Sequence, residues 1–416
     1  MTRELLTGNG AAAWGARLAR VDYLPAFPIT PQTEIIETMA HWIESREIPC
    51  KMVTLDSEHS MITAAGAAAV TGVRVFTATS SQGLLYGTEM IYSVAGWRVP
   101  LVMVNVSRGL SAPITLEPDH NDVLAMRDSG FLQIHCATCQ EVLDSMLMAY
   151  HLAEDEEVRL PVIVNLDGFY LSFTREPVAI PEQEAVDRFL PPFAANNIRF
   201  RANESLSEGV AVLGGAAYSY FRYETHLASL NALDVYKRIC TKFEKSFGRN
   251  YQPVECYRSE DAEIVYLMIG SFATKAKEAV DRLREAGEKV GLIRPRLLRP
   301  FPADDLAAAL AGKLGVAVID QNISMGKGGI LQMELASALY GRPEAPKVLA
   351  SFIGGLGGRD ISPEEFYEIA SFVKQAVATG VTPPPRLLYT EAELAEVRNQ
   401  QTIARAVAGD RGGDHD

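Results

Sequence analysis

The stretch that decides the fold is LDSEHSMITAAGAAAVTGVRVFTATSSQG, residues 55–83. It places an acid, Glu58, ahead of a helix of small residues expected over His59 to Gly72. A buried β-branched strand is expected over Val73 to Thr79, and the polar turn Ser80 to Gly83 opens the next helix. An order of helix, strand, turn and helix predicts an open α/β sheet.

Glu58 is the first candidate for chemistry. A helix N-terminus stabilises a carboxylate, whereas neighbouring apolar surface favours its protonated form, and enzymes use acids poised in this way. The alternative is that Ser57 and Glu58 only start the helix. Ser81 and Gln82 support the functional interpretation, because open α/β sheets bind ligands where strand ends meet helix starts. The helix after this turn is expected over Leu84 to Ala95.

Length and charge narrow the class of protein. A chain of 416 residues can form two or three domains. A net charge of −13 argues against nucleic acid as a partner, because no basic surface is expected to offset phosphate repulsion. The sequence contains no apolar run of about 18 residues and no signal-peptide start, so we expect no membrane span and a cytoplasmic location.

The five cysteines include one close pair, Cys136 and Cys139. One CxxC motif offers too few ligands for an iron–sulfur cluster or a structural zinc ion. We therefore expect two buried thiols here and any redox centre on another chain.

Two further loops offer groups for a ligand. Thr30 stands between Ile29 and Pro31 in a proline-stiffened segment before a helix expected over Thr33 to Ile43, so its hydroxyl is a candidate ligand group; an ordinary strand-to-helix turn is the alternative. Arg108 follows an apolar strand expected over 99–106, where a guanidinium can take a carboxylate bidentately; a surface salt bridge is the alternative.

Two motifs suggest other sites. Asp119, His120 and Asp122 lie in the long loop 111–122 and resemble metal ligands, but a hydrogen-bonded turn is favoured. Residues 7–10 (TGNG) resemble the start of a dinucleotide-binding loop but lack the third glycine and the later acid.

The alternation of strands and helices continues along the chain and predicts two α/β domains. The first spans 1–245, with a linking segment from about 177, and the second, smaller domain spans 260–385. A C-terminal helix and tail occupy 386–416. Within the second domain a turn is expected over 294–302, and residues 194–260 are not assigned.

The order of these motifs resembles the α subunit of the 2-oxoacid:acceptor oxidoreductases, of the pyruvate:ferredoxin oxidoreductase type. The matching segments are FPITPQTEI (27–35), DSEHSMITAAGAA (56–68), FTATSSQGL (76–84), SRGLSAPI (107–114), DHND (119–122), RDSGF (127–131) and LPVIVNLDGF (160–169). Later segments, including RPRLLRPFP (294–302) and GGLGGRDIS, are similar to the family's second domain. The resemblance covers roughly 1–380.

The resemblance implies a thiamine diphosphate pyrimidine-binding-type parallel-sheet domain, followed by a smaller transketolase C-terminal-like α/β domain. The chain has no GDG motif, so the resemblance assigns the Mg²⁺ and the diphosphate to a separate β subunit. A γ subunit, a ferredoxin-like iron–sulfur subunit and, where NAD is the acceptor, a flavoprotein subunit are the other implied partners, in a dimer of heteromers.

The resemblance also implies a mechanism. Glu58 matches the glutamate that activates the pyrimidine ring, and Thr30 and Arg108 match the residues that grip the 2-oxoacid. Ile29, Ser81 and Gln82 are the other expected cofactor-binding residues. The implied reaction is oxidative decarboxylation of a 2-oxoacid with coenzyme A, with electrons passing to iron–sulfur clusters on partner subunits and then to ferredoxin or NAD.

Two substitutions bear on the substrate. Gly109 replaces an alanine and Glu117 a tryptophan of the RALSAPINIW pattern common in pyruvate enzymes. Loss of bulk beside Arg108 favours a larger acid such as phenylglyoxylate, unless these positions lie away from the substrate; pyruvate is the commoner substrate. A non-catalytic assembly subunit and a stand-alone dinucleotide-binding dehydrogenase are the alternative functions.

Overall fold

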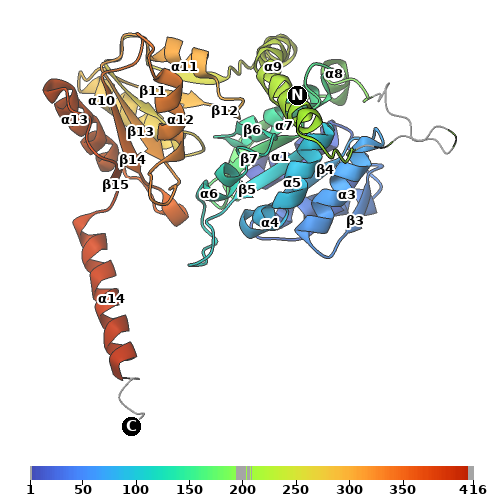
Figure 1. Ribbon diagram of the computed structural model, residues 1–416, viewed down its shortest axis with the longest axis horizontal. Coiled ribbons are helices and arrows are strands. Elements are labelled where there is room, and N and C mark those ends of the chain that lie inside the picture. Colours follow the sequence, from blue (N-terminus) through green and yellow to red (C-terminus); the bar gives the residue numbers. More distant parts are fainter. Residues whose placement is uncertain (1, 194–202, 204–206, 208, 411–416) are drawn as a thin grey trace.

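The computed structural model describes residues 2–193, 203, 207 and 209–410, and it shows two α/β bodies packed side by side (Figure 1). A parallel sheet forms the centre of each body. The blue-to-green half of the chain builds the first body and the yellow-to-red half builds the second.

The first body contains a five-stranded sheet in the order β12-β6-β7-β5-β4. Its strands are β4 (Phe76–Thr79), β5 (Val102–Ser107), β7 (Val162–Asp167), β6 (Leu132–His135) and β12 (Leu297–Arg299). All are parallel except β12, which runs antiparallel to β6. A parallel pair, β2 (Tyr23–Ala26) and β3 (Lys51–Thr54), lies beside β4 through a bridge between Tyr23 and Val75.

Helices cover both faces of this sheet because its strands are apolar on both sides. Val102, Val104 and Val106 of β5 pack into the core formed with α1 (Gly8–Leu18), α2 (Thr33–Glu44) and α7 (Cys139–Glu154). Met103, on the opposite face of the same strand, packs with α3 (Glu58–Val70) and α5 (Thr88–Trp97). The short helices α4 (Ser81–Tyr86) and α6 (Asn121–Ala125) contact each other.

The second body contains a six-stranded sheet in the order β15-β14-β13-β10-β11-β9. Its strands are β9 (Val254–Tyr257), β10 (Ile264–Leu267), β11 (Val290–Pro295), β13 (Gly315–Asp320), β14 (Val348–Ile353) and β15 (Arg386–Leu387). Helices α10 (Ala273–Glu285) and α13 (Pro363–Thr379) cover one face. Helices α11 (Ala303–Leu310) and α12 (Ile330–Leu339) cover the other, in a core that continues into the first body.

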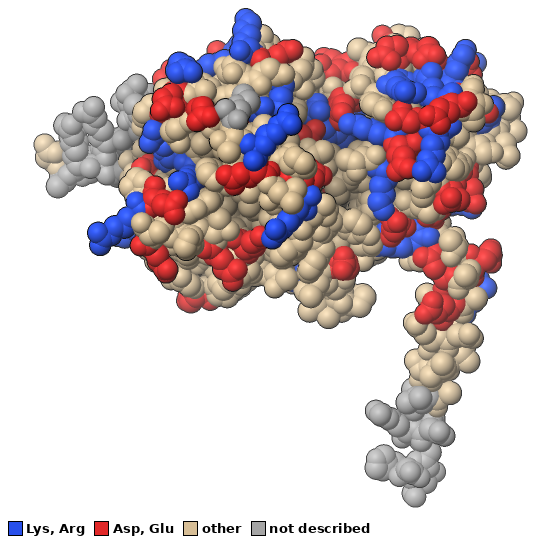
Figure 2. All heavy atoms as spheres, turned by 180° about the vertical axis from the view of Figure 1, so that it is seen from behind, with Lys and Arg blue, Asp and Glu red and all other residues tan. Residues whose placement is uncertain are grey.

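The remaining elements join or flank the two bodies. Strand β1 (Thr2–Thr7) pairs antiparallel with β8 (Arg175–Ile180), α8 (Gln183–Phe189) follows, and α9 (Gly215–Phe247) is a long helix that packs against α7. A 3-10 turn spans Leu356–Gly358, and α14 (Glu391–Asp410) extends away from the body (Figure 1). Figure 2 shows acidic and basic side chains interspersed over the rear face of the molecule. In the described residues no helix is both long and apolar enough to cross a membrane.

Three local expectations from the sequence need correction. The helix expected over Leu84 to Ala95 is two helices, α4 and α5, which meet at Gly87, where a Cβ atom would lie 2.2 Å from Ile62 Cδ1. The linking segment from 177 contains most of β8 and all of α8, in which Val178, Ile180, Val186 and Phe189 are buried. The turn expected over 294–302 supplies β12, which joins the sheet of the other body. The proposed domain boundaries stay a prediction.

The glycine-rich residues 7–10 and the pair Cys136 and Cys139 lie in packed parts of the first body. Helix α1 begins at Gly8, where a Cβ atom would lie 2.5 Å from the carbonyl oxygen of Leu171. The glycine is therefore explained by this contact. Cys136 and Cys139 are buried free thiols, as expected, and burial raises the pKa of Cys136 to about 12.

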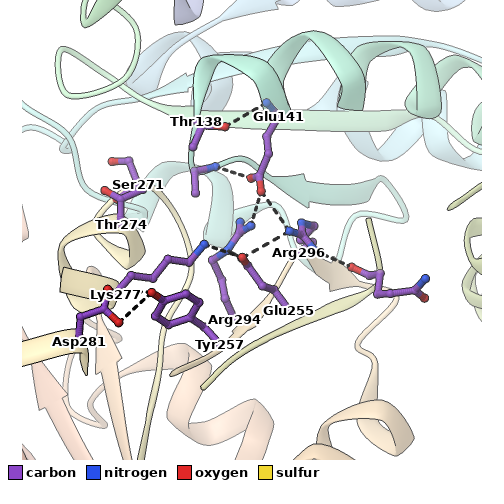
Figure 3. A network of polar contacts seen from close by, with 12 residues as sticks. Thr138, Glu141, Glu255, Tyr257, Ser271, Thr274, Lys277, Asp281, Arg294 and Arg296 are labelled. Carbon is purple, nitrogen blue, oxygen red and sulfur yellow. Dashed lines mark hydrogen bonds and ion pairs between the residues drawn. The ribbon is translucent and has the colours of Figure 1, made fainter. Parts of the chain in front are cut away.

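A buried ionic network joins the two bodies (Figure 3). Arg294, which is fully buried on β11, donates to Glu141 of α7 at 2.5 Å and to Glu255 of β9 at 2.6 Å. Arg296 also reaches Glu141, at 3.1 Å. Burial by itself would raise the pKa of Glu255, but Arg294, Arg296 and Lys277 outweigh it and hold that pKa at about 2. The network therefore stays ionised at neutral pH.

We expect Arg294→Met to destabilise the chain by about 3–5 kcal/mol, because it leaves the buried Glu141 carboxylate and the half-buried Glu255 carboxylate without their main cation. Urea denaturation followed by circular dichroism measures this loss. Arg282→Met is the matched control, since the Arg282–Glu278 pair is exposed and such pairs contribute less than about 1 kcal/mol. Equal losses in the two variants would contradict the role given to Arg294.

Candidate active site

The candidate active site lies at the carboxyl ends of the strands of the first body. Thr30 lies in the segment after β2, Glu58 starts α3 after β3, Ser81 and Gln82 follow β4, and Arg108 follows β5. Parallel strands bring their carboxyl ends to one edge, so segments that are far apart in the sequence meet there. The structure thus brings together residues that the sequence identified separately.

Glu58 is the first residue of α3, and its side chain is buried, with 7% exposure. Ser57 caps the helix by accepting a hydrogen bond from the Ser60 amide at 3.2 Å, so Glu58 is not needed for that purpose. A Cβ atom at position 83 would lie 2.5 Å from Glu58 Oε1, and Gly83 therefore lets α4 approach the carboxylate. In the described part of the chain the Glu58 carboxylate has no hydrogen-bond or ion-pair partner, which leaves both oxygens available to a ligand.

Arg108 is buried, with 7% exposure, and is held by neutral groups. Its guanidinium donates to the carbonyl oxygen of Thr30 at 2.8 Å and to Gln82 Oε1 at 2.6 Å. Its Nε is buried without a partner. Burial lowers the pKa of Arg108, and the charges of Asp122 and Glu58 offset this only in part.

No carboxylate of the described residues lies within 4.0 Å of the Arg108 guanidinium, which rules out the surface salt bridge considered from the sequence. A buried cation with free donors is suited to bind an anion.

Thr30 is exposed beside Arg108, and Ile29 is half-buried. The Thr30 carbonyl receives the Arg108 hydrogen bond. The Thr30 hydroxyl has no protein partner among the described residues. It is thus free to meet a ligand bound at the guanidinium.

Gln82 connects the two loops around Arg108. Its Oε1 accepts from the guanidinium, and its Nε2 donates to Ser111 Oγ at 3.0 Å. Ser81 Oγ lies 2.7 Å from Gln82 Oε1 and 2.9 Å from the Gly109 carbonyl oxygen. Ser81 and Gln82 therefore orient Arg108 from the side of α4.

Asp119, His120 and Asp122 form hydrogen bonds within the protein. Asp119 Oδ1 accepts from the Asn121 amide at 3.0 Å, and His120 Nε2 lies 2.7 Å from Asp167 Oδ1. Burial alone would lower the pKa of His120, but the nearby carboxylates, Asp167 above all, outweigh it and raise that pKa. Across the described residues, no three His, Cys, Asp or Glu side chains come together as metal ligands would.

This segment also joins the two bodies. Asp167 Oδ2 accepts from the amide and the hydroxyl of Ser271, which belongs to the second body, at 2.7 and 2.6 Å. The His120 amide donates to the Gln321 carbonyl at 2.8 Å. The loop after Arg108 is consequently held from both sides.

Sequence reasoning missed the buried polar layer beneath these loops. Asn105 and Asn165 face each other in the β5–β7 register and bond at 2.9 Å, and the Asp122 carboxylate accepts from Asn105 at 3.1 Å. The signal was an asparagine interrupting each of two β-branched strands, VMVNVS and VIVNLD. A polar residue in such a strand needs a buried partner.

The two substitutions considered for substrate size do not open space. A Cβ atom at position 109 would lie 2.6 Å from Thr115 Cγ2 and 3.1 Å from Asp119 Oδ2, so Gly109 permits close loop packing. Glu117 lies against Gly358 of the second body, where a Cβ atom would be 2.5 Å from Glu117 Cβ. The idea that lost bulk at these positions widens the site is therefore not supported.

Comparison with known proteins identifies the family. The family model described as pyruvate flavodoxin/ferredoxin oxidoreductase, thiamine diphosphate-binding, matches residues 14–245, and the model of pyruvate:ferredoxin oxidoreductase core domain II matches 262–366. Pyruvate synthase subunit PorA of Methanothermobacter thermautotrophicus is 42% identical over 369 residues, 89% of this chain and 94% of that protein. Ketoisovalerate oxidoreductase subunit VorA of Pyrococcus horikoshii is 40% identical over 379 residues, 91% of this chain and 95% of that protein.

A solved structure shares the fold. The 2-oxoglutarate:ferredoxin oxidoreductase of Magnetococcus marinus, with 2-oxoglutarate, coenzyme A and succinyl-CoA bound, superposes with a TM-score of 0.68 at 22% identity. The match covers 90% of this chain and 65% of that one, so this chain spans about two-thirds of the longer polypeptide. Together with the two family models, this confirms the α/β class and the resemblance seen in the motifs. The chain belongs to the pyruvate flavodoxin/ferredoxin oxidoreductase family.

Proposed function

We propose that this chain is the α subunit of a thiamine-dependent 2-oxoacid oxidoreductase. The reaction joins a 2-oxoacid and coenzyme A to give acyl-CoA, CO₂, one proton and two electrons. Family membership supports the reaction, and the names of the relatives as subunits support a multi-subunit assembly. The observation that carries the proposal is Arg108, a buried guanidinium whose hydrogen-bond acceptors among residues 2–193, 203, 207 and 209–410 are all uncharged.

Arg108 would bind the substrate carboxylate. Burying a cation away from water is costly unless an anion pairs with it, and a 2-oxoacid brings its own carboxylate. The exposed Thr30 hydroxyl, beside the guanidinium, would donate to the ketone oxygen. Gln82 would keep the guanidinium from rotating. These groups orient the bond between the carboxylate and the ketone carbon, which is the bond that breaks when CO₂ leaves.

The residues fit thiamine diphosphate at its pyrimidine end. Glu58 is a buried carboxylate without a partner in the part of the chain that the structure describes, and Gly83 leaves room beside it. Glu58 would hold a proton at a ring nitrogen, with Ile29, Ser81 and Gln82 around the ring. When bound, thiamine diphosphate supplies a carbon nucleophile for the ketone and accepts the electron pair released with CO₂.

Other polypeptides would complete the enzyme. The chain lacks a GDG motif, so we assign Mg²⁺ and the diphosphate to a β subunit. We assign iron–sulfur clusters to a ferredoxin-like subunit, and we expect a γ subunit and, with NAD as acceptor, a flavoprotein subunit. A cytoplasmic dimer of heteromers is the assembly that we propose.

We expect Arg108→Ala in the assembled complex to raise KM for the 2-oxoacid and to lower kcat, with kcat/KM falling about 100-fold or more, because the carboxylate loses a bidentate partner. Steady-state assays with ferredoxin as acceptor measure this. Arg127→Ala is the control, since among the described residues the Arg127 side chain bonds only Leu124, Asp128 and Glu334. Wild-type kcat/KM in Arg108→Ala would remove Arg108 from the site.

We expect Glu58→Gln to leave the complex assembled but inactive, because an amide cannot hold the proton at the ring nitrogen as a carboxylic acid can. Size-exclusion chromatography checks assembly, and single-turnover assays with saturating thiamine diphosphate check the chemical step. Glu89→Gln, on the exposed side of α5, serves as the matched substitution. Full activity in Glu58→Gln would show that this carboxylate has no part in activation and would favour a non-catalytic subunit.

We expect the purified complex to turn over pyruvate with a higher kcat/KM than phenylglyoxylate, because Thr115 and Asp119 fill the space beside Gly109. Parallel assays with both acids, and with 2-oxoisovalerate as an intermediate size, measure the preference. A preference for phenylglyoxylate would show that the pocket widens elsewhere.

A further inference from the structure

Asp122, the second residue of α6, receives hydrogen bonds from several parts of the site. Its side chain is fully buried. Oδ1 accepts from the Ser107 hydroxyl at 3.0 Å and from the Val123 amide at 2.7 Å. Oδ2 accepts from the Ser81 amide at 3.1 Å, from Asn105 Nδ2 at 3.1 Å and from the Arg108 amide at 3.2 Å. One carboxylate therefore accepts five hydrogen bonds.

Two of these donors belong to the loops that form the substrate site. Arg108 carries the guanidinium, and Ser81 precedes Gln82, whose Oε1 accepts from that guanidinium. Ser81 has a φ of 47°, a left-handed conformation that residues with a Cβ atom rarely adopt. Asp122 holds the amide of this unfavourable turn and the amide of Arg108 with the same oxygen.

The Arg108 guanidinium lacks the partner that usually fixes an arginine. It bonds a backbone carbonyl and an amide oxygen, and in the described residues it has no ion pair. Its place is consequently set by the two loops. We propose that Asp122 is a positioning residue of the 2-oxoacid site, which fixes the Arg108 guanidinium by holding the backbone amides of Ser81 and Arg108. This inference rests on the proposed function.

The arrangement requires a carboxylate. An asparagine side chain has one oxygen and one NH₂ group, and each Asp122 oxygen faces at least one backbone N–H. In either orientation of the asparagine side chain, its NH₂ group would face one of these backbone N–H groups. That N–H group would then lack a hydrogen-bond acceptor. Substitution by asparagine thus keeps the size of the side chain but removes the hydrogen bonds that one of the two carboxylate oxygens accepts.

The second body supports Asp122 through the residues just before it. The His120 amide donates to the Gln321 carbonyl, and the Ile323 amide donates to Asn121 Oδ1 at 3.0 Å. This loop of the second body therefore fixes where α6 begins. Asp122, near the start of α6, in turn fixes the loops of the first body through its hydrogen bonds with the Ser81 and Arg108 amides.

The test is a double-mutant cycle in the assembled complex, with Asp122→Asn, Arg108→Ala and the double variant. We expect Asp122→Asn to raise KM for pyruvate about tenfold, with a smaller change in kcat, because charge-assisted bonds to the Arg108 loop are lost. We expect the dissociation constant of oxamate, a non-reacting isostere, to rise by a similar factor in calorimetry. In the Arg108→Ala background, Asp122→Asn should change KM less than about twofold, because it acts through that arginine.

Asp144→Asn is the matched control. Asp144 of α7 is also a fully buried carboxylate, and it bonds Arg249 and Tyr251, which follow α9, rather than the site loops. We expect Asp144→Asn and Asp122→Asn both to lower the melting temperature, because each changes a buried carboxylate. We expect Asp144→Asn to leave KM for pyruvate unchanged. An unchanged KM in Asp122→Asn, or an effect of the same size with and without Arg108, overturns the inference. An unchanged KM in Arg108→Ala alone overturns the proposed substrate site as well.

Ser107→Ala is the second variant if Asp122→Asn does not assemble. It keeps the carboxylate and removes one donor to Oδ1. We expect it to raise KM for pyruvate about threefold, since one neutral hydrogen bond is lost. A wild-type KM in this folded variant overturns the inference.

Discussion

The buried and unpaired charge of Arg108 is the constraint on which the site depends. A guanidinium withdrawn from water without an anion costs on the order of several kcal/mol, which the rest of the fold must offset. Hydrogen bonds to two neutral acceptors, the Thr30 carbonyl and Gln82 Oε1, offset part of this desolvation free energy. A substrate that carries a carboxylate would meet the rest, so binding and charge neutralisation would occur together. Enzymes often hold such strained or uncompensated groups where the reaction takes place.

The polar layer under the site explains how such a charge is held in place. Asp122, Asn105 and Asn165 form a buried hydrogen-bonded set between the strands, in which Asn105 Oδ1 has no partner among the described residues. A network with several shared bonds resists displacement because any shift breaks more than one of them at once. The same layer continues through the ion pair of His120 and Asp167 to Ser271. The second body is in this way part of the site's support, although it contributes none of the proposed catalytic side chains.

The two bodies are joined by charged as well as apolar contacts. The fully buried Arg294 donates hydrogen bonds to Glu141 of the first body and Glu255 of the second. Strand β12 follows β11 of the second body in the chain but pairs with β6 in the sheet of the first body. Removing one partner of a buried ion pair destabilises a protein by more than the intact pair stabilises it relative to apolar side chains of similar size. A shift of one body that separated these charges would therefore be costly, and the network specifies one relative placement of the bodies. That placement keeps the loop 117–122 beside Gln321 and Gly358. The geometry of Arg108 is therefore coupled to the seam between the bodies.

The sequence by itself determined the α/β class, the order of its elements and the family, because hydrophobic periodicity, turn residues and motif order are local properties of the chain. It also singled out candidate site residues one by one: Glu58 at a helix start, Thr30 in a proline-stiffened segment, and Ser81, Gln82 and Arg108 at strand ends. Only the tertiary structure decided that Arg108 has no carboxylate partner among the described residues, that Gly109 packs against Thr115, and that Asp122 bonds both site loops. Contacts of this kind join residues that are distant in the chain, and burial, which gives each of them its energetic weight, exists only once the sheets have packed. The break of the helix at Gly87 and the transfer of β12 to the other sheet have the same cause, since a neighbouring side chain or strand overrides the local preference.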